Sequence, residues 1–399
     1  MKLGKQRIHD QPVNDITTLG TYAQQVQHEA QQRGVVLPPQ ILLHIGEPSF
    51  RTPEHIRLAA MHAIETEPIT YGPAAGWPWL RELIADKIQR INGYTVSPKH
   101  VAIAMGGTGA LQATFMATVK DGDEVLIPDP AWPLYQMQLA ACGATGVPYP
   151  LDPHNDWLPT IADLEKLVTP RTRILLTNTP GNPTGAIFPK QVISDLLDFA
   201  RRHDLYLVSD ECYDQIVFEG EHMSPATMLS QEEFELGRFI GIYTFSKTYA
   251  MTGWRIGYVV TGTDLLKTIV DVLNAGYTNM STPIQHAAAA ALTGPQECVA
   301  EMCEAYRRRR DLTVSLLKDY GRYLYTPHGA FYTLIDVTGK HGELRGRQFA
   351  LDLLGERNIA VAPGSGFGSV SQHFIRISLA ASEEELERAI PEICEFADR

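Results

Sequence analysis

Short apolar runs alternate with amphipathic stretches from about residue 78 to about residue 260. The amphipathic stretches, in which apolar residues recur every three or four positions, predict helices over residues 79–91, 109–119 and 190–203. The apolar runs predict strands over residues 101–104, 124–127, 173–178, 205–209, 239–244 and 257–260. Strands that are apolar on both faces and separated by helices indicate an α/β fold, with a parallel-type sheet covered on both sides.

The pattern changes beyond residue 290. It predicts a long helix over residues 297–320, strand-like segments over 331–337 and 374–378, and an acidic helix over 383–396. Such a mixture indicates a second, smaller α+β domain. We therefore expect a large domain over residues 46–288, and a small domain formed by residues 1–45 together with 289–399.

Composition narrows the class of protein. The chain has 399 residues, 44% of them hydrophobic, and a formal net charge of -12, from 34 Lys and Arg against 46 Asp and Glu. This acidic balance argues against nucleic acid or an anionic membrane surface as the main partner. No apolar run approaches the roughly 20 residues that span a bilayer, and the N-terminal residues lack the apolar segment of a secretory signal. We expect a cytoplasmic protein.

The cysteines support the same expectation. They are odd in number, scattered and without CxxC spacing: Cys142, Cys212, Cys298, Cys303 and Cys394. Such a set predicts neither a disulfide framework nor a metal site, and it is typical of a reducing compartment.

A lysine stands just after a predicted strand. Lys247 follows strand 239–244 in a segment that continues to Arg255. Ligands of open α/β sheets bind beyond the carboxyl ends of strands, so this amine can point into a cleft and react with a carbonyl group. Arg255 can offer a planar fork to a phosphate, with Thr244 and Ser246 as hydroxyl donors. Taken alone, such a segment is more often a surface loop with an ordinary lysine.

The whole segment, TFSKTYAMTGWRIGY, resembles the cofactor-lysine segment of class I and II aminotransferases almost position for position. The resemblance extends over roughly residues 41 to 382. It implies fold type I, with a mainly parallel seven-stranded sheet in the large domain, and transfer of an α-amino group from an amino acid to a 2-oxo acid. It also implies that Lys247 holds pyridoxal 5'-phosphate as an internal aldimine, that a pyridoxamine form is the intermediate, and that Thr244, Ser246 and Arg255 bind the phosphate.

Two further motifs follow predicted strands. Residues 178–185, NTPGNPTG, match the family's NxPxNPTG signature, although turn chemistry alone explains their prolines and glycines. Asp210 and Tyr213 lie in SDECY, where an aspartate taken alone is more often a helix N-cap. By resemblance, Asp210 pairs with the protonated pyridine nitrogen and keeps the ring an electron sink. Tyr213 and Asn182 then bond the 3-oxygen of the ring, and Asn182 also contacts the substrate carboxylate.

A glycine-rich turn, GGTGA at residues 106–110, follows strand 101–104 and opens a helix, where backbone N–H groups form an anion site. Its spacing does not fit the GxGxxG of a dinucleotide site. By resemblance, Gly107 and Thr108 contact the cofactor phosphate. Trp132 alone is more often a core indole; the resemblance implies that it stacks on the pyridine ring.

Three residues concern the substrate and the assembly. Arg376 alternates with apolar neighbours in the strand 374–378, and an inward arginine needs a partner, either a structural carboxylate or a ligand. The resemblance implies the substrate α-carboxylate. It also implies that Gly46, in GEPSF, approaches the substrate. Tyr71, otherwise a surface turn tyrosine, would reach the cofactor phosphate of a neighbouring subunit, so we expect a homodimer with shared active sites.

The donor is expected to be a neutral amino acid. Relatives with acidic substrates bind the second carboxylate with a lysine at the position of Thr108, or with an arginine in the segment that resembles residues 274–282. Here Thr108 is neutral, and no Lys or Arg lies between Lys267 and Arg307. Aspartate would require a cation from the N-terminal segment or a flexible loop.

Two other classes stay open. A lyase that eliminates at Cβ or Cγ uses the same scaffold. A ligand-sensing regulator would need a DNA-binding domain, for which the roughly 40 residues ahead of GEPSF leave no expected room.

Overall fold

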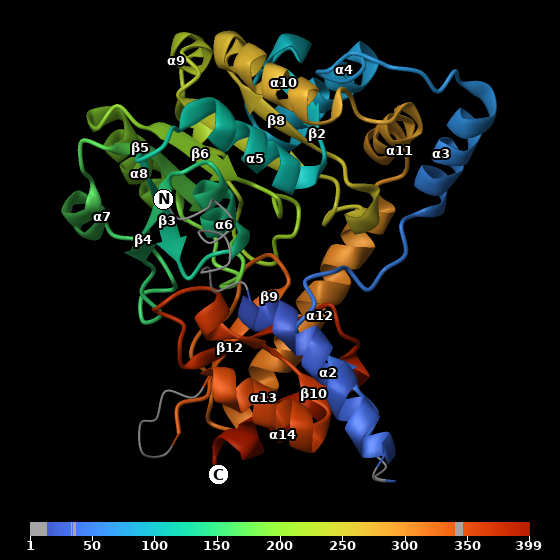
Figure 1. Cartoon of the computed structure of the whole chain (residues 1–399), viewed down its shortest axis with the longest axis vertical. Helices are drawn as coiled ribbons and strands as arrows, with labels where there is room; N and C mark the ends of the chain where they lie inside the picture. The colour runs from blue at the N-terminus through green and yellow to red at the C-terminus, as the bar shows by residue number, and fades with distance from the viewer. Residues whose placement is uncertain (1–13, 33, 35–36, 340–345) are drawn as a thin grey trace.

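The computed structural model describes residues 14–32, 34, 37–339 and 346–399. Its upper part in Figure 1 is built around a seven-stranded sheet, and its lower part contains two small sheets and several helices. The long helix α12 (Glu297–Asp319) runs from the upper part into the lower part. Residues 1–13 of the expected small domain lie outside the described residues.

The large sheet confirms the predicted α/β class. Its strands are β2 (Val101–Ala104), β3 (Glu124–Asp129), β4 (Thr145–Pro150), β5 (Thr172–Asn178), β6 (Tyr206–Asp210), β7 (Phe239–Thr244) and β8 (Gly257–Thr261), in the order β2-β8-β7-β6-β5-β3-β4. Strand β8 runs antiparallel to β2 and β7, and the pairs among the other strands are parallel. The sheet is therefore mainly parallel.

Helices cover both faces of this sheet because its strands are apolar on both sides. In β3, Val125 and Ile127 pack on one face and Leu126 on the other. The first face is covered by α5 (Gly106–Thr118), α6 (Leu134–Ala141) and α10 (Thr263–Tyr277). The second is covered by α4 (Pro78–Lys87), α7 (Ile161–Leu167), α8 (Lys190–Arg202) and α11 (Thr282–Thr293).

Helix α8 shows how the sequence produces this arrangement. Its buried residues Ile193, Leu196, Leu197 and Ala200 recur with helical spacing and form one apolar stripe against the sheet. Two further helices, α3 (Glu54–Thr66) and α9 (Gln231–Glu235), lie at the periphery of the upper part.

The lower part has its own core. A three-stranded antiparallel sheet has the order β11 (Ala362–Pro363), β12 (Phe374–Ser378), β9 (Tyr332–Asp336), and β1 (Ile41–Leu42) pairs with β10 (Ile359–Ala360). Around them lie α2 (Asn14–Gln32), α13 (Gly346–Arg357) and α14 (Glu383–Ala397). Helix α14 begins with a capping box, in which Ser382 and Glu385 satisfy each other's backbone N–H groups.

Several bounds differ from the predictions. Helix α5 begins at Gly106 rather than at residue 109, and β6 spans residues 206–210 rather than 205–209, with Asp210 at the end of the strand as expected. The helix predicted over residues 79–91 is α4 followed by a π-helical turn, Ile88–Asn92.

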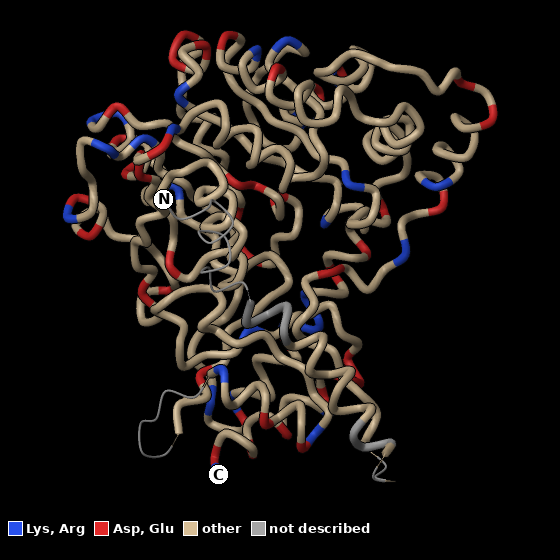
Figure 2. Tube along the Cα trace, in the orientation of Figure 1, with Lys and Arg blue, Asp and Glu red and all other residues tan. Residues whose placement is uncertain are grey.

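The surface carries both signs of charge. Figure 2 shows acidic and basic residues interspersed around the outside of the chain. Of the helices in the described part of the chain, none has the length and apolar character to span a bilayer.

Candidate active site

The carboxyl ends of β5, β6 and β7 bring three polar side chains to one edge of the sheet. In the strand register, Asn178 lies opposite Asp210, and Asp210 lies opposite Ile242, two residues before Thr244. The Asn178 side-chain amide donates a hydrogen bond to the Asp210 carbonyl, with a distance of 3.1 Å. This edge is where open α/β sheets bind ligands.

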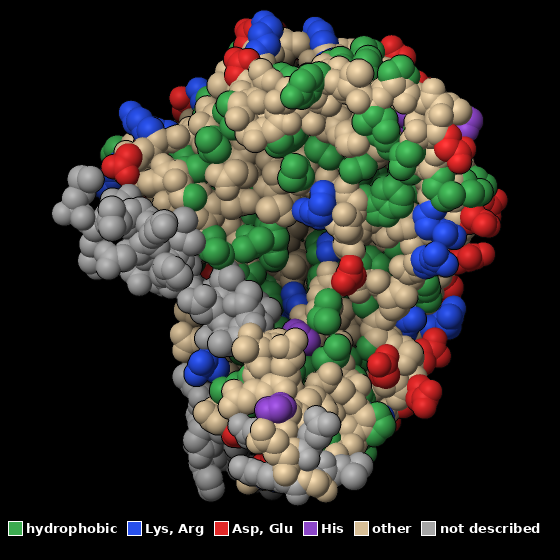
Figure 3. Space-filling model, turned by 45° about the vertical axis from the view of Figure 1, so that its right-hand side comes forward, with side chains coloured by type: hydrophobic (Ala, Val, Ile, Leu, Met, Phe, Trp, Pro, Cys, Tyr) green, Lys and Arg blue, Asp and Glu red, His purple; other side chains and the backbone are tan. Residues whose placement is uncertain are grey.

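A pocket of about 550 Å³ lies at this edge, between the large sheet and the β9–β12 strands of the lower part. Figure 3 looks into a hollow between the two parts, with basic side chains inside it. All of the predicted site residues but one line the pocket: Gly46, Gly107, Thr108, Trp132, Asn182, Asp210, Tyr213, Thr244, Ser246, Lys247, Arg255 and Arg376. The exception is Tyr71, whose side chain is 86% exposed.

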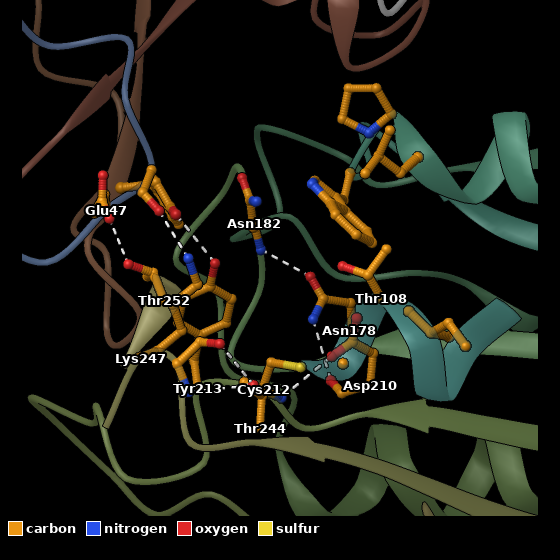
Figure 4. A pocket seen from close by; sticks show the side chains of 18 of the residues that line it. Glu47, Thr108, Asn178, Asn182, Asp210, Cys212, Tyr213, Thr244, Lys247 and Thr252 are labelled. Carbon is orange, nitrogen blue, oxygen red and sulfur yellow. Dashed lines mark hydrogen bonds between the residues drawn. The ribbon is translucent and has the colours of Figure 1, made fainter. Parts of the chain in front are cut away.

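Lys247 reaches into the pocket from the loop after β7. Its Nζ donates a 2.7 Å hydrogen bond to the carbonyl of Gly46. Behind it, the Thr244 hydroxyl donates to the Ser246 hydroxyl at 2.9 Å. Figure 4 shows Lys247 and Tyr213 on one side of the pocket and Asp210 on the other, with Cys212 between them.

Asp210 is a buried carboxyl with two donors. The Tyr135 hydroxyl donates to its Oδ2 at 2.5 Å, and the backbone N–H of Cys212 donates to its Oδ1 at 3.1 Å. Burial raises the pKa of Asp210 above its usual range, and hydrogen bonds from Cys212 and Tyr135 act against this rise. A carboxyl in this state is stabilised by a cationic partner within the pocket.

The other end of the pocket is built to hold an anion. Helix α5 begins there without a side-chain cap from Met105, and the backbone N–H groups of a helix's first turn have no partner within the helix. Arg255 adopts left-handed φ of 56°, and its Nη1 donates to the Thr252 carbonyl at 2.7 Å. A Cβ atom on Gly106 would lie 2.7 Å from Arg255 Nη2, and one on Gly107 would lie 2.8 Å from Cys212 Sγ. The two glycines therefore let backbone, guanidinium and thiol converge.

Arg376 is fully enclosed on β12. Its Nη1 donates to the Asn182 side-chain oxygen at 3.1 Å, and its Nη2 donates to the His44 carbonyl at 2.6 Å. Its guanidinium carbon contacts the rings of Tyr332 and Phe367, at 4.5 and 4.7 Å from their centroids. No carboxylate among the described residues forms a salt bridge with it, so its charge is available to an anionic ligand.

Sequence reasoning missed several residues that shape the pocket. Tyr135 bonds Asp210, and Tyr332 and Phe367 enclose Arg376. Each is an aromatic residue without a charged neighbour in the sequence, which is the usual appearance of a core residue. The sequence did contain one indication for two of them. Tyr332 and Phe367 lie in GAFY and APGSGFG, two segments that resemble the family.

The donor set fits pyridoxal 5'-phosphate. The cofactor has a basic ring nitrogen, a phosphate and an aldehyde, and the pocket has a buried carboxyl at Asp210, an anion cradle at Gly107 and Arg255, and an amine at Lys247. A cationic ring nitrogen could pair with the buried Asp210 carboxyl, and the first turn of α5 with Arg255 could bind the phosphate.

Comparison with known proteins agrees with a pocket for pyridoxal 5'-phosphate. The family model "Aminotransferase class I and II" matches residues 38–393. The aspartate/prephenate aminotransferase of Thermus thermophilus is 38% identical over 366 residues, covering 91% of each chain. Aromatic-amino-acid aminotransferase 2 of Thermococcus litoralis is 37% identical, over 88% of this chain and 90% of that protein.

The solved structures give the same result. A single mutant of the Thermus thermophilus aspartate aminotransferase has a TM-score of 0.87 at 35% identity, with 96% of each chain covered. These relatives have the type I fold. Their names describe amino transfer, so they do not favour the alternative of a lyase. The chain therefore belongs to the class I and II aminotransferase family, as an enzyme that uses pyridoxal 5'-phosphate to move amino groups between amino acids and 2-oxo acids.

Proposed function

We propose that Lys247 binds the cofactor covalently and, once displaced by the substrate, moves the proton at Cα. Bound pyridoxal phosphate supplies an electron-withdrawing ring that accepts negative charge from the substrate. The Lys247 amine lies 2.7 Å from the Gly46 carbonyl, at the loop that we propose to approach the substrate. An amine held there can take a proton from Cα and return it on the cofactor side, as general base and then general acid.

The other pocket residues are proposed to hold the substrate and the cofactor. Arg376 binds the substrate α-carboxylate, which Asn182 also contacts, and Gly46 approaches the substrate. Asp210 pairs with the ring nitrogen, and Tyr213 and Asn182 bond the 3-oxygen of the ring. The indole of Trp132 stacks on the ring. The phosphate is bound by Gly107, Thr108, Thr244, Ser246 and Arg255. Support comes from the position of all these residues around one pocket.

Replacing Tyr135 with phenylalanine is expected to weaken cofactor binding. The hydrogen bond from Tyr135 is one of those that lower the pKa of Asp210 against the effect of burial. Without it the pKa of Asp210 rises further, the carboxyl stays protonated to higher pH, and it pairs less well with a ring nitrogen. Titration of the apoenzyme should give a Kd for pyridoxal phosphate raised about tenfold.

Tyr149→Phe is the matched control, because this buried tyrosine donates to the Leu176 carbonyl, at 2.8 Å, rather than to Asp210. The Tyr135→Phe effect should be larger at pH 6 than at pH 8, because a carboxyl with a raised pKa becomes more protonated as the pH falls. Equal Kd values for Tyr135→Phe and the unaltered enzyme at both pH values would exclude this role.

We further propose a neutral amino-acid donor. The pocket-lining cations in the described part of the chain are Lys247, Arg255 and Arg376, and each has a proposed role already. Burial lowers the pKa of His44, as does the nearby charge of Arg376, so its imidazole is neutral at pH 7. The carboxylate of Glu47 also lines the pocket. A second substrate carboxylate would therefore meet no free cation, which is the observation that carries this proposal.

A panel of amino donors tests it. The names of the relatives include both aspartate and aromatic amino acids, so they do not decide the question. Phenylalanine, leucine and aspartate are compared by the loss of the cofactor's visible absorbance after a single addition. We expect phenylalanine or leucine to react with a kcat/KM at least about tenfold above that of aspartate. A higher value for aspartate than for every neutral donor would refute the proposal.

A charge introduced into the pocket sharpens this test. Thr108→Lys should raise kcat/KM for aspartate relative to phenylalanine by about ten- to a hundredfold, the scale of one charge-assisted hydrogen bond. Thr108→Ser, which adds no charge, should leave the ratio unchanged.

We also propose that the enzyme is a homodimer in which Tyr71 reaches the pocket of the partner. Helix α3 exposes Leu58, Met61 and Ile64, at 53%, 57% and 59%, and Ile69 and Tyr71 follow at 57% and 86%. Figure 3 shows hydrophobic side chains gathered beside the hollow. Such a stripe marks an interface on a folded chain.

The dimer is tested by light scattering. Ile64→Arg should shift the mass from two chains toward one and weaken cofactor binding, whereas His62→Arg, at a neighbouring exposed position, should not. Tyr71→Phe should keep the dimer and raise the Kd for pyridoxal phosphate about tenfold. A monomeric enzyme that binds the cofactor fully would contradict the proposal.

Two broader expectations stay proposals. The division into residues 46–288 and residues 1–45 with 289–399 is supported by the separate cores of the upper and lower parts, and limited proteolysis would locate the boundary. A cytoplasmic location is supported by five cysteines without a disulfide, and cell fractionation tests it.

A further inference from the structure

We propose that Tyr332 is a positioning residue that orients the Tyr213 hydroxyl toward the cofactor and, with the face of its ring, fixes Arg376 for the substrate carboxylate. This inference rests on the proposed roles of Tyr213 and Arg376. It goes beyond them because it assigns one side chain of the lower part to both the cofactor end and the substrate end of the reaction.

The sheet of the lower part places the Tyr332 ring against Arg376. Strands β9 and β12 pair with Tyr332 opposite Ser378 and Leu334 opposite Arg376. Tyr332 and Arg376 are therefore diagonal neighbours on the same face, a relation in which long and aromatic side chains reach each other. The Arg376 guanidinium carbon lies 4.5 Å from the centroid of the Tyr332 ring, in a buried setting that strengthens a cation–π contact.

This contact matters because the hydrogen bonds of Arg376 are incomplete. Its two terminal nitrogens donate to Asn182 and His44, but its buried Nε has no hydrogen-bond partner among the residues that the structure describes. The rings of Tyr332 and Phe367, whose centroids lie 4.5 and 4.7 Å from the guanidinium carbon, therefore help to fix the guanidinium in place. A planar fork held in this way is ready to grip a carboxylate with two parallel bonds.

The hydroxyl of Tyr332 lies at the other end of the site. It is 3.0 Å from the Tyr213 hydroxyl, and the two rings meet edge to face, 5.8 Å apart with an angle of 84°. It also lies against the loop of Gly46, where a Cβ atom would be only 2.5 Å from it. The carbonyl of the same glycine accepts the Lys247 amine. One hydroxyl thus touches Tyr213 and the residue that holds Lys247.

The direction of the hydrogen bond between the two phenols follows from proton count. A phenol has one proton to donate. Burial, together with the neighbouring Tyr332, raises the pKa of Tyr213 well above its usual range, so its proton is retained at neutral pH. If Tyr213 donates that proton to an oxygen of the ligand, Tyr332 must be the donor between the two phenols. Donors in series strengthen one another, so Tyr332 makes Tyr213 a better donor.

The consequence is a measurable shift in the bound cofactor. A stronger hydrogen bond from Tyr213 draws negative charge from the cofactor's ring oxygen, which then holds a proton on the adjoining Lys247 nitrogen less tightly. Tyr332→Phe removes only the hydroxyl. The pH midpoint of the visible absorbance of the substrate-free holoenzyme should therefore rise by about half to one pH unit.

The ring of Tyr332 predicts a second, separable effect. An α-methyl amino acid has no proton on Cα, so its Kd reports carboxylate binding without turnover. Tyr332→Phe keeps the ring beneath Arg376 and should change this Kd by no more than about twofold. Tyr332→Leu should raise both the midpoint and the Kd, the latter roughly tenfold or more. Phe367→Leu removes the other ring that contacts Arg376 and should raise the Kd alone.

A double-mutant cycle decides between positioning and a general structural role. In a Tyr213→Phe background, Tyr332→Phe should cause no further shift of the midpoint, because the hydroxyl acts only through Tyr213. An unchanged midpoint in Tyr332→Phe, or a shift that persists in the Tyr213→Phe background, would overturn the inference. If Tyr213→Phe itself leaves the midpoint unchanged, the proposed role of Tyr213 fails instead, so the two failures are distinguishable.

Discussion

Replacing Lys247 with alanine is expected to lower the rate of amino transfer by roughly a million-fold, the scale on which loss of a reacting side chain acts. The variant loses both the covalent attachment of the cofactor and the group that moves the Cα proton. Its pocket keeps Asp210 and the anion cradle at Gly107 and Arg255, so cofactor should still bind without a covalent bond. Stopped-flow absorbance after addition of an amino donor measures the loss.

Lys247→Arg distinguishes the reactivity of the Lys247 amine from its positive charge. It keeps a cation near the Gly46 carbonyl, but its guanidinium neither forms the covalent bond nor gives up a proton at neutral pH. Both variants should therefore be inactive to the same degree. If either retained the turnover of the unaltered enzyme, Lys247 would not be the reacting amine.

The second large effect is expected at Arg376. Arg376→Leu should reduce kcat/KM for the amino donor by roughly a hundred- to several-thousandfold, because removing one partner of a buried charge pair costs about 3 to 5 kcal/mol. Arg376→Lys keeps the charge but loses the planar fork that Asn182 and the His44 carbonyl orient. The kcat/KM of this variant should lie between that of Arg376→Leu and that of the unaltered enzyme. Steady-state kinetics with saturating 2-oxo acid measures these values.

A primary amine without a carboxylate provides the matched substrate control. It should react slowly, and equally slowly, with the unaltered enzyme and with Arg376→Leu, because neither reaction uses the carboxylate grip. A loss of the same size for the amine and for the amino acid would mean that Arg376 supports the fold rather than the substrate.

The periodicity of the sequence predicted the scaffold because the two are physically linked. Buried parallel strands must be apolar on both faces, and this pattern marks β5, β6 and β7, whose carboxyl ends carry Asn178, Asp210 and Thr244. Chemistry-bearing residues at the ends of such strands could therefore be expected at one edge, and the pocket lies there.

Other features depend on contacts that the pattern does not contain. Helix α5 begins three residues earlier than predicted. The sequence alone favoured a later start, because glycine is a poor helix former by propensity. In the structure, Gly106 and Gly107 are required by the close approach of Arg255 and Cys212. Tyr332 and Tyr135 could not be told from core residues, since their roles follow from partners 119 and 75 residues away in the sequence.

No element could be predicted in the N-terminal region, although residues 1–45 were expected to belong to the small domain. Helix α2 packs Leu19 and Ala23 into the core of the lower part, yet the segment has no motif and only a weak apolar stripe. Tyr71 is the reverse case, a residue with an implied role that a single chain does not display. Its implied partner lies on another chain, so Tyr71 is exposed here.

The most direct measurement is borohydride reduction of the holoenzyme, followed by digestion and mass spectrometry of the peptides. Hydride fixes an imine as a stable amine, so a cofactor bound to a lysine leaves a pyridoxyl group on that side chain. We predict one modified peptide, containing Lys247 and none of the other lysines. A pyridoxyl group on a different lysine, or no modified peptide from a protein that carries the cofactor, would contradict the assignment on which the proposed function is built.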